Sequence, residues 1–293
     1  MPGRKELIDL LGPFPSPVEP QASVVESHSC EGYVRERIEY DVESGERVAA
    51  YLLRPDVGGR RPAILCHHQH ASTFDLGKSE VVGLAGDPDQ AVGPELARRG
   101  FVVFAPDAIG FEERNWSAPT GRAEYVEMSS RLVRGETLLA KVLHDVSVAL
   151  DVLEARPEVD SDRIGFFGHS YGGRMAIWAT ASDPRITCAV SHCGCIGYAD
   201  SVAHRVGIQP EFCVPGILGR FEIDDVIRMI APRRFMLSTC TEDTYSMGAL
   251  AIADAVRDAF PDGAFRHVEW QDGHVLTGPM REAACDFLEA TLT

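Results

Sequence analysis

The sequence lacks any apolar run long enough to span a membrane, and it has few basic residues. A membrane-spanning helix needs about 18 or more consecutive apolar residues, and none of the 293 residues lies in such a run. Lysine and arginine number 28 against 44 acidic residues, for a formal net charge of −16. We therefore expect no binding to nucleic acid or to a membrane surface, since both attract basic proteins. The same charge disfavours strongly anionic substrates at long range, although a local arginine such as Arg174 could reverse this.

The sequence also lacks a basic start followed by an apolar segment, which is what a secretory signal has. Cys193 and Cys195 could form a redox or metal pair, but no matching cysteine or histidine spacing accompanies them. Several of the eight cysteines sit inside apolar runs. We therefore expect buried, reduced thiols in a cytoplasmic protein that has no cofactor and no metal.

No repeat or linker divides the chain, and short apolar runs alternate with helical patterns. The expected strands are 48–53, 63–66, 101–105, 163–167, 186–191, 234–238 and 265–270. The expected helices are 94–99, 136–155, 172–181, 247–260 and 279–292. This alternation predicts an α/β fold with one mostly parallel sheet, of about eight strands, flanked by helices. Residues 1–293 then form a single domain.

Three irregular segments stand outside that alternation. Residues 12–20 hold four prolines, so the region 1–32 is expected to be an N-terminal arm that lies on the domain. Residues 111–135 and 197–222 are irregular and carry aromatic residues and proline. Both are either surface loops or segments that cover an active site, and His204, Phe212 and Phe221 are candidate pocket residues.

The most informative motif is Gly168-His169-Ser170-Tyr171-Gly172-Gly173. It lies between an expected strand and an expected helix, where the turn exposes the serine hydroxyl and the glycines permit close backbone approach. The dipole of the following helix favours negative charge at this point. We therefore predict that Ser170 is a nucleophile rather than a passive turn residue.

A serine nucleophile needs a base, which in this arrangement follows an acid along the chain. His274 comes just after the last expected strand, whereas His267 lies within it. We therefore predict His274 as the base. The acid should follow the preceding strand, where Glu242 and Asp243 both occur, and a turn favours the shorter aspartate.

The strand 63–66 ends in His67-His68-Gln69-His70. Adjacent side chains in an extended loop point apart, so these histidines are not expected to hold a metal, even with His204 as a further ligand. We expect this loop to supply an oxyanion-binding amide from His68 or Gln69, with Tyr171 supplying the other.

These motifs, with Glu242-Asp243 and Asp272-Gly273-His274, resemble the α/β-hydrolase superfamily. More narrowly, they are similar to its dienelactone hydrolase-like and acetyl xylan esterase-like branch. Further stretches that carry the resemblance are 65–70 with 77–78, 95–107, 151–165 and 230–233. The resemblance implies a serine hydrolase with Ser170, Asp243 and His274 as the triad. Dienelactone hydrolases proper use a cysteine nucleophile, so Ser170 argues against that specific activity.

The resulting hypothesis is a carboxylic ester hydrolase that acts on a small acyl ester or lactone through an acyl-enzyme intermediate. A homo-oligomer is the one protein assembly that we consider. A biosynthetic enzyme that performs acyl transfer, cyclisation or C–C cleavage would use the same triad and differ only in its pocket. A peptidase or a non-catalytic binding protein is less favoured. The peptidase relatives carry a large extra domain, and binding alone does not require a triad.

Overall fold

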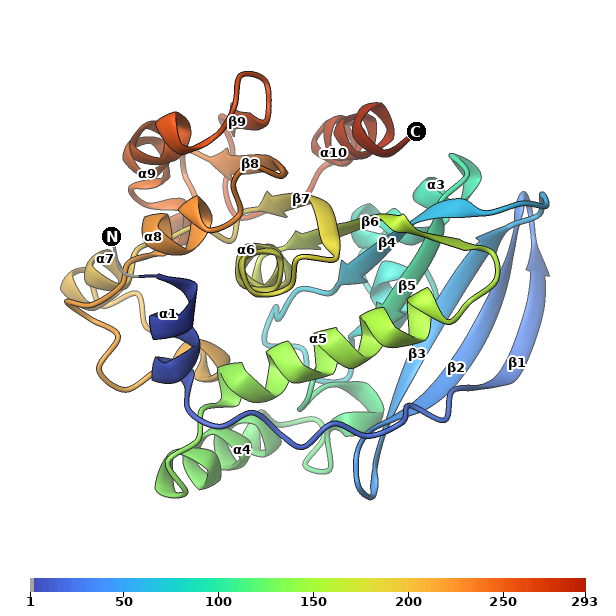
Figure 1. The fold of residues 1–293 in the computed structure, drawn as a ribbon, viewed down its shortest axis with the longest axis horizontal. Coiled ribbons are helices and arrows are strands. Elements are labelled where there is room, and N and C mark those ends of the chain that lie inside the picture. Colours follow the sequence, from blue (N-terminus) through green and yellow to red (C-terminus); the bar gives the residue numbers. More distant parts are fainter. Residues whose placement is uncertain (1–2) are drawn as a thin grey trace.

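The computed structural model describes residues 3–293, which fold around one nine-stranded sheet (Figure 1). The strands are β1 (Ser23–Cys30), β2 (Tyr33–Glu43), β3 (Glu46–Pro55), β4 (Arg61–His67), β5 (Val102–Pro106), β6 (Val159–His169), β7 (Ile186–His192), β8 (Arg234–Cys240) and β9 (Phe265–Trp270). The α-helices are α1 (Arg4–Leu11), α2 (Lys78–Val81), α3 (Val92–Arg98), α4 (Arg122–Val133), α5 (Leu138–Glu154), α6 (Tyr171–Ser182), α7 (Tyr198–Ala203), α8 (Ile223–Arg228), α9 (Ala249–Val256) and α10 (Gly278–Leu292). No helix among the described residues is both long and apolar enough to cross a membrane.

The sheet has the order β1-β2-β3-β5-β4-β6-β7-β8-β9. From β5 through β4 to β9 every neighbouring pair is parallel, whereas β1, β2 and β3 pair antiparallel with one another and with β5. Parallel pairs need crossover connections, which here are mostly helical. The predicted α/β fold with a mostly parallel, helix-flanked sheet is thus confirmed, although the sheet has nine strands rather than eight.

Two strands, β1 and β2, lie outside the seven ranges expected from the sequence, and β1 falls in the region 1–32, which was expected to be only an arm. There α1 buries Leu7 and Leu11, and the proline-containing stretch leads along α5 to β1 (Figure 1). Strand β1 pairs with β2 from Ser23 opposite Glu39 to Cys30 opposite Tyr33. Most of its side chains are exposed, so it shows none of the apolar alternation by which a half-buried strand is recognised in a sequence.

Helices cover both faces of the sheet, as a parallel core requires. On one face, α1, α5, α6, α8 and α9 contribute to one apolar core, and α2, α3 and α10 contribute to a second core on the other. Helix α5 begins where the Thr137 side chain accepts a hydrogen bond from the Ala140 amide. That hydroxyl also donates to the Leu11 carbonyl at 2.6 Å, and this bond ties α1 to the domain.

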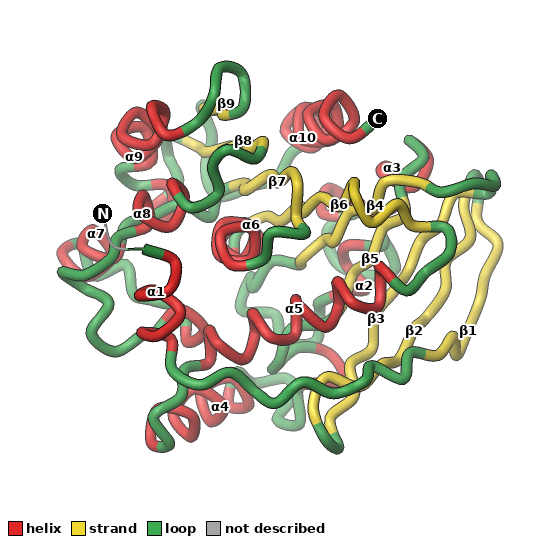
Figure 2. Tube along the Cα trace, in the orientation of Figure 1, coloured by secondary structure: helices red, strands yellow, loops and turns green. Residues whose placement is uncertain are grey.

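Figure 2 shows long loops between α7 and α8, within residues 197–222. In the other irregular segment, 111–135, Glu112 and Glu113 both contact the buried Lys78 ammonium, which also lies 2.6 Å from Asp107. These acidic side chains, which follow Phe111, hold their segment to the domain through a buried cation. A buried ammonium is tolerated only when carboxylates compensate it in this way.

Candidate active site

Ser170 occupies a sharp turn between β6 and α6, with φ 58° and ψ −114°. Residues other than glycine rarely adopt a positive φ, and such strained positions concentrate at functional sites. The Ser170 amide donates to the His192 carbonyl at 2.8 Å, which fixes the turn against the neighbouring strand β7. The predicted strand–turn–helix context of the motif is therefore present in the structure.

Two glycines of the motif allow that turn to form. A Cβ at Gly172 would lie 2.1 Å from the His67 carbonyl oxygen, and a Cβ at Gly168 would lie 2.1 Å from Gly172. Real Cβ atoms do not approach backbone atoms so closely, so both positions require glycine. The absence of these side chains lets α6 begin directly against the end of β4.

The structure brings Ser170, His274 and Asp243 into one chain of hydrogen bonds. The Ser170 Oγ lies 2.7 Å from Nε2 of His274, and His274 Nδ1 lies 2.9 Å from Oδ1 of Asp243. These residues follow β6, β9 and β8 respectively, at one edge of the sheet. Glu242, the alternative acid, is exposed, and within residues 3–293 only its backbone amide has a hydrogen-bond partner, the Asp272 carbonyl. The geometry therefore favours Asp243.

The local environment keeps Asp243 ionised. Its side chain is fully buried, and burial alone would raise its pKa. Hydrogen bonds from His274, the Ser246 hydroxyl and the Tyr245 amide outweigh burial, so the pKa of this carboxyl lies below its ordinary value. A carboxylate that accepts three donors can hold the imidazole in one tautomer and stabilise its cation.

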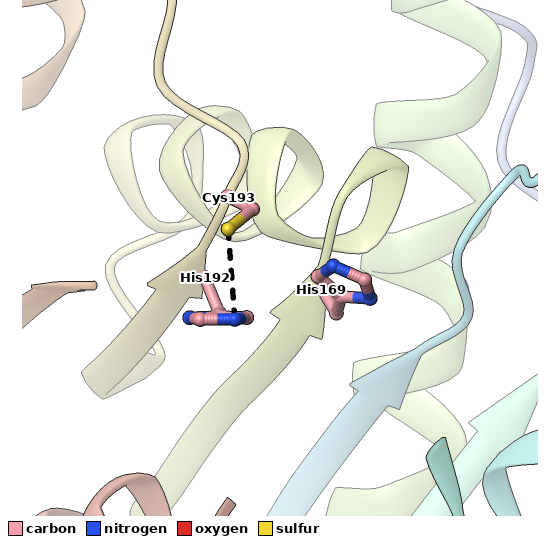
Figure 3. A group of neighbouring side chains, drawn as sticks. All are labelled: His169, His192 and Cys193. Atoms are coloured by element: carbon pink, nitrogen blue, oxygen red, sulfur yellow. Dashed lines mark hydrogen bonds between the residues drawn. The ribbon is translucent and has the colours of Figure 1, made fainter. Parts of the chain in front are cut away.

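Two further histidines lie beside His274: His192 contacts the loop that carries it, and the His169 ring centroid lies 5.1 Å from that of His274. Figure 3 shows His169 and His192 at the ends of adjacent strands, with Cys193 beside His192. The His192 ring contacts the Ser238 hydroxyl at 2.8 Å and the Val275 carbonyl at 2.7 Å. Burial lowers the pKa of His192 to about 4 and that of His169 well below its usual range. Both rings are therefore neutral at physiological pH.

His169, His192 and Cys193 also offer ligand atoms within 4.8 Å of one another, a spacing that a metal ion could use. However, both ring nitrogens of His192 already have protein partners. A hydrogen bond with Cys240 and burial raise the pKa of Cys193, which disfavours the thiolate that binds metals. We interpret the group as support for the His274 loop.

Ser170 and His274 line a small cavity of about 190 Å³. Its wall consists of His70, Ala71, Ser72, Ser170, Arg174, Cys193, Gly194, Gln209, Tyr245 and His274. Typical pockets for drug-sized ligands are about 300–1,000 Å³, so this one suits a small group. Tyr245 covers His274, with ring centroids 4.9 Å apart. The sequence analysis missed His70, Gln209 and Tyr245 as pocket residues, although Tyr245 follows the acid by two positions.

The residues of the loop after β4 that line the cavity are His70, Ala71 and Ser72. That a backbone amide of His68 or Gln69 binds the oxyanion stays a prediction. The His68 ring is buried and hydrogen-bonded to the Gln69 carbonyl and the Ala108 amide, and its pKa is lowered to about 4 by burial. The Gln69 side chain turns away to Glu80. The backbone of Tyr171, the other expected oxyanion donor, opens α6 directly after Ser170.

The structure corrects the three residues expected to line the pocket. His204 is exposed, and among the described residues its ring forms a hydrogen bond only with the Asp200 carbonyl of its own helix. Phe212 and Phe221 are buried in the apolar core. The composition of the segment 197–222 indicated a possible cover over the active site, but it could not distinguish aromatic residues of the core from those of the pocket. Only Gln209 of that segment, and no described residue of 111–135, lies on the cavity wall.

The nine-stranded sheet, the strained serine turn and the positions of the three polar residues define a hydrolase of the α/β-hydrolase fold. The sequence profile of the dienelactone hydrolase family matches residues 76–215. "Putative hydrolase YtaP" of Bacillus subtilis (strain 168) is 30% identical over 99% of this chain and 98% of its own length. The chain belongs to the dienelactone hydrolase family.

Solved structures agree in fold. Methylesterase BT1017 superimposes with a TM-score of 0.73 at 19% identity, over 99% of this chain and 64% of that protein. A putative acetyl xylan esterase from Bacteroides fragilis NCTC 9343 gives a TM-score of 0.71 at 18% identity, over 98% and 86% of the two chains. At these identities the likeness establishes the fold and leaves the reaction to the site.

Proposed function

We propose that this protein hydrolyses small carboxylic esters through a covalent intermediate on Ser170. The observation that carries the proposal is the hydrogen-bonded chain from Asp243 through His274 to Ser170 at the wall of a small cavity. The ester-cleaving names of the similar solved structures point the same way. Family membership alone does not fix the substrate.

The geometry supports one direction of proton transfer. Asp243 accepts a hydrogen bond from Nδ1 of His274, which leaves Nε2 of the ring free to accept the Ser170 proton. Ser170 Oγ then attacks the acyl carbon, and His274 returns the proton to the departing alcohol. Water, deprotonated by the same ring, attacks the acyl-enzyme and releases the acid and Ser170. No step needs a group from outside the chain except the ester and water.

The oxyanion formed in each attack needs hydrogen-bond donors. We assign the first to the Tyr171 amide, which as the first residue of α6 has no acceptor within its own helix. We assign the second to a backbone amide of the loop 68–70, which ends at the cavity wall. Loss of one such donor costs about 10²–10³ in kcat in serine hydrolases.

Hydrolysis of a series of 4-nitrophenyl esters, from acetate to decanoate, tests this function. We expect the shortest esters to be cleaved fastest, because the cavity holds about 190 Å³. Ser170→Ala should reduce kcat by about 10⁴-fold or more, and Ser129→Ala, on α4 and away from the cavity, serves as the matched control. Equal rates in wild type and Ser170→Ala, or no hydrolysis of any ester, would refute the proposal.

A further inference from the structure

Two cysteine side chains from neighbouring strands meet beside the catalytic residues. Cys193, labelled in Figure 3, directly follows β7, and Cys240 ends β8. Their sulfur atoms lie 3.5 Å apart, and the Cys193 amide donates to the Ser238 carbonyl at 2.9 Å, which holds the two strand ends together. Cys195, the near neighbour of Cys193 in the sequence, packs instead in the core on the other face of the sheet. The thiol pair thus joins residues 47 positions apart, which no local motif indicates.

The separation of the two sulfur atoms is close to that in a disulfide. The bond is about 2.05 Å long, so the sulfur atoms need to approach by about 1.5 Å. Disulfides join Cα atoms about 4.4–6.8 Å apart, and neighbouring strands lie about 4.8 Å from each other. Formation of the bond therefore requires local movement rather than rearrangement of the sheet.

The pair is shielded from bulk solvent but lies at the cavity. Both thiols are nearly fully buried, yet Cys193 belongs to the wall that Ser170 and His274 also line. A cavity of about 190 Å³ has room for several small molecules of the size of water or hydrogen peroxide. A small oxidant that enters the cavity is therefore the kind of reagent to which the pair can respond.

The two thiols differ in acidity. The Cys193 thiol donates a hydrogen bond to the Cys240 sulfur. This bond lowers the pKa of Cys240 below its ordinary value despite burial and, together with burial, raises the pKa of Cys193. The thiolate is the form that attacks an oxidant, and a neighbouring thiol then closes the disulfide. The pair thus has an attacking thiol, Cys240, and a resolving thiol, Cys193.

The turn after β8 couples the pair to the triad. Asp243 follows Cys240 by three residues, and its amide donates to the Cys240 carbonyl at 3.3 Å. The Cys193 sulfur, a carboxylate oxygen of Asp243 and a ring nitrogen of His274 also lie within 4.8 Å of one another. Movement of Cys240 toward Cys193 therefore displaces the turn that holds the catalytic carboxylate. A misplacement of about 1 Å in an active site can cost about 10²-fold in rate.

We propose that hydrogen peroxide converts Cys193 and Cys240 into a reversible disulfide and that this bond inactivates the hydrolase. The inference rests on the proposed ester hydrolysis and adds the regulation of that same site. The disulfide ties the end of β7 to the end of β8, and reduction by a thiol releases it.

The oxidation balances with one molecule of hydrogen peroxide. The Cys240 thiolate attacks one peroxide oxygen, the O–O bond breaks, and a sulfenic acid forms on Cys240. The hydroxide that leaves takes up the proton that Cys240 had lost and becomes water. The Cys193 sulfur then attacks the Cys240 sulfur, the S–O bond breaks, and a second water leaves with the Cys193 proton. The two thiols lose two electrons and two protons, which the peroxide receives.

Oxidation of the wild-type protein tests the bond and its effect separately. Reduced protein is treated with hydrogen peroxide, the excess is destroyed with catalase, and hydrolysis of 4-nitrophenyl acetate is measured. We expect kcat to fall by about 10–100-fold and to recover in dithiothreitol. Peptide mass spectrometry without reduction should show the peptides that contain Cys193 and Cys240 joined, and lighter by two hydrogen atoms than the separate reduced peptides.

Variants then assign the effect to this pair. Cys240→Ser and Cys193→Ser each remove one partner, so peroxide should neither join the peptides nor cause a loss of activity that dithiothreitol reverses. Each variant is compared with its own reduced form, which removes any difference in basal rate. Cys30→Ser removes a partly exposed thiol on β1 that is not part of the cavity wall, and it should retain the wild-type response. Labelling of Ser170 by a fluorophosphonate confirms that each reduced variant is folded.

The outcomes distinguish failure of the disulfide from failure of the proposed function. A peroxide-treated wild type without the joined peptides would overturn the disulfide, and joined peptides with undiminished hydrolysis would overturn its effect. A reversible loss that persists in both cysteine variants would contradict the assignment. If the reduced wild type hydrolyses no ester, the proposed function fails, whereas the peptide masses and the rate of Ser170 labelling after oxidation still test the disulfide and its effect.

Discussion

Arg114 and Arg174 are both buried arginines, but only Arg114 forms ion pairs with carboxylates among the described residues. The Arg114 guanidinium contacts Glu46 and lies 2.7 Å from Asp145, and these carboxylates raise its pKa despite burial. Arg174 has no carboxylate partner among the described residues, and burial lowers its pKa. A compensated charge holds a structure together, whereas an uncompensated one beside a nucleophile is available to a ligand.

The same contrast separates two whole regions. Around residues 107–114, Lys78 and Arg114 are surrounded by carboxylates from several segments. At the cavity, the Arg174 guanidinium has no carboxylate partner among the described residues, and the Asp243 carboxylate accepts hydrogen bonds from three donors. We therefore expect substitutions in the first region to reduce stability and substitutions at the cavity to reduce catalysis.

The largest expected effect distinguishes two neighbouring acids at the cavity. Asp243→Asn should lower kcat for a short ester by about 10⁴-fold, because an amide no longer holds the His274 tautomer that accepts the Ser170 proton. Glu242→Gln, one residue away and exposed, is the control and should change kcat little. Steady-state rates of both variants measure this, and a similar loss in the two would contradict the assignment of Asp243.

The next effect compares the two arginines directly. Arg114→Met should reduce the free energy of unfolding by about 3–5 kcal/mol, because it leaves Glu46 and Asp145 without their cation. Arg174→Met should leave the stability nearly unchanged or raise it, since it removes a buried charge that has no carboxylate partner. Urea unfolding of each variant measures the difference. Equal destabilisation would mean that Arg174 is compensated after all.

The smallest effect concerns buried histidines that carry no charge. The folded pKa of His192 is about 4, below an unfolded value of about 6.5. As the pH falls, His192 therefore takes up a proton in the unfolded chain before it does so in the folded protein. The stability conferred by neutral His192 is present above pH ~6.5 and is lost between pH ~6.5 and ~4. The free energy of unfolding falls by at most ~3 kcal/mol over that window. His192→Gln should show a shallower loss of stability across that window, measured by urea unfolding at several pH values. If the free energy of unfolding of His192→Gln depended on pH as steeply as that of the wild type, the assignment of this effect to His192 would be contradicted.

Much of this architecture follows from local patterns in the sequence. The strand 265–270 was predicted with the observed bounds, and β6, the Ser170 turn and α6 follow in the predicted order. An apolar strand and a glycine-dependent turn each depend on a few neighbouring residues, so both can be predicted from the sequence alone. Strand β1 was missed because an exposed edge strand carries no apolar period.

The pocket could not be predicted in the same way. Whether Phe212 faces the core or the cavity depends on how α6 and the segment 197–222 pack together, and no local pattern records that. Arg174 was noted in the sequence without a direction for its side chain. The structure adds that no carboxylate oxygen of the described residues lies within 4.0 Å of its guanidinium.

The most direct test of the central claim is to treat the folded protein with a fluorophosphonate and locate the adduct by peptide mass spectrometry. The account predicts one stoichiometric adduct, on Ser170, that is absent from Ser170→Ala and forms far more slowly in Asp243→Asn. Such a pattern requires a serine activated by His274 and Asp243. A folded wild-type sample that remains unlabelled, or that is labelled at another residue, would contradict the account.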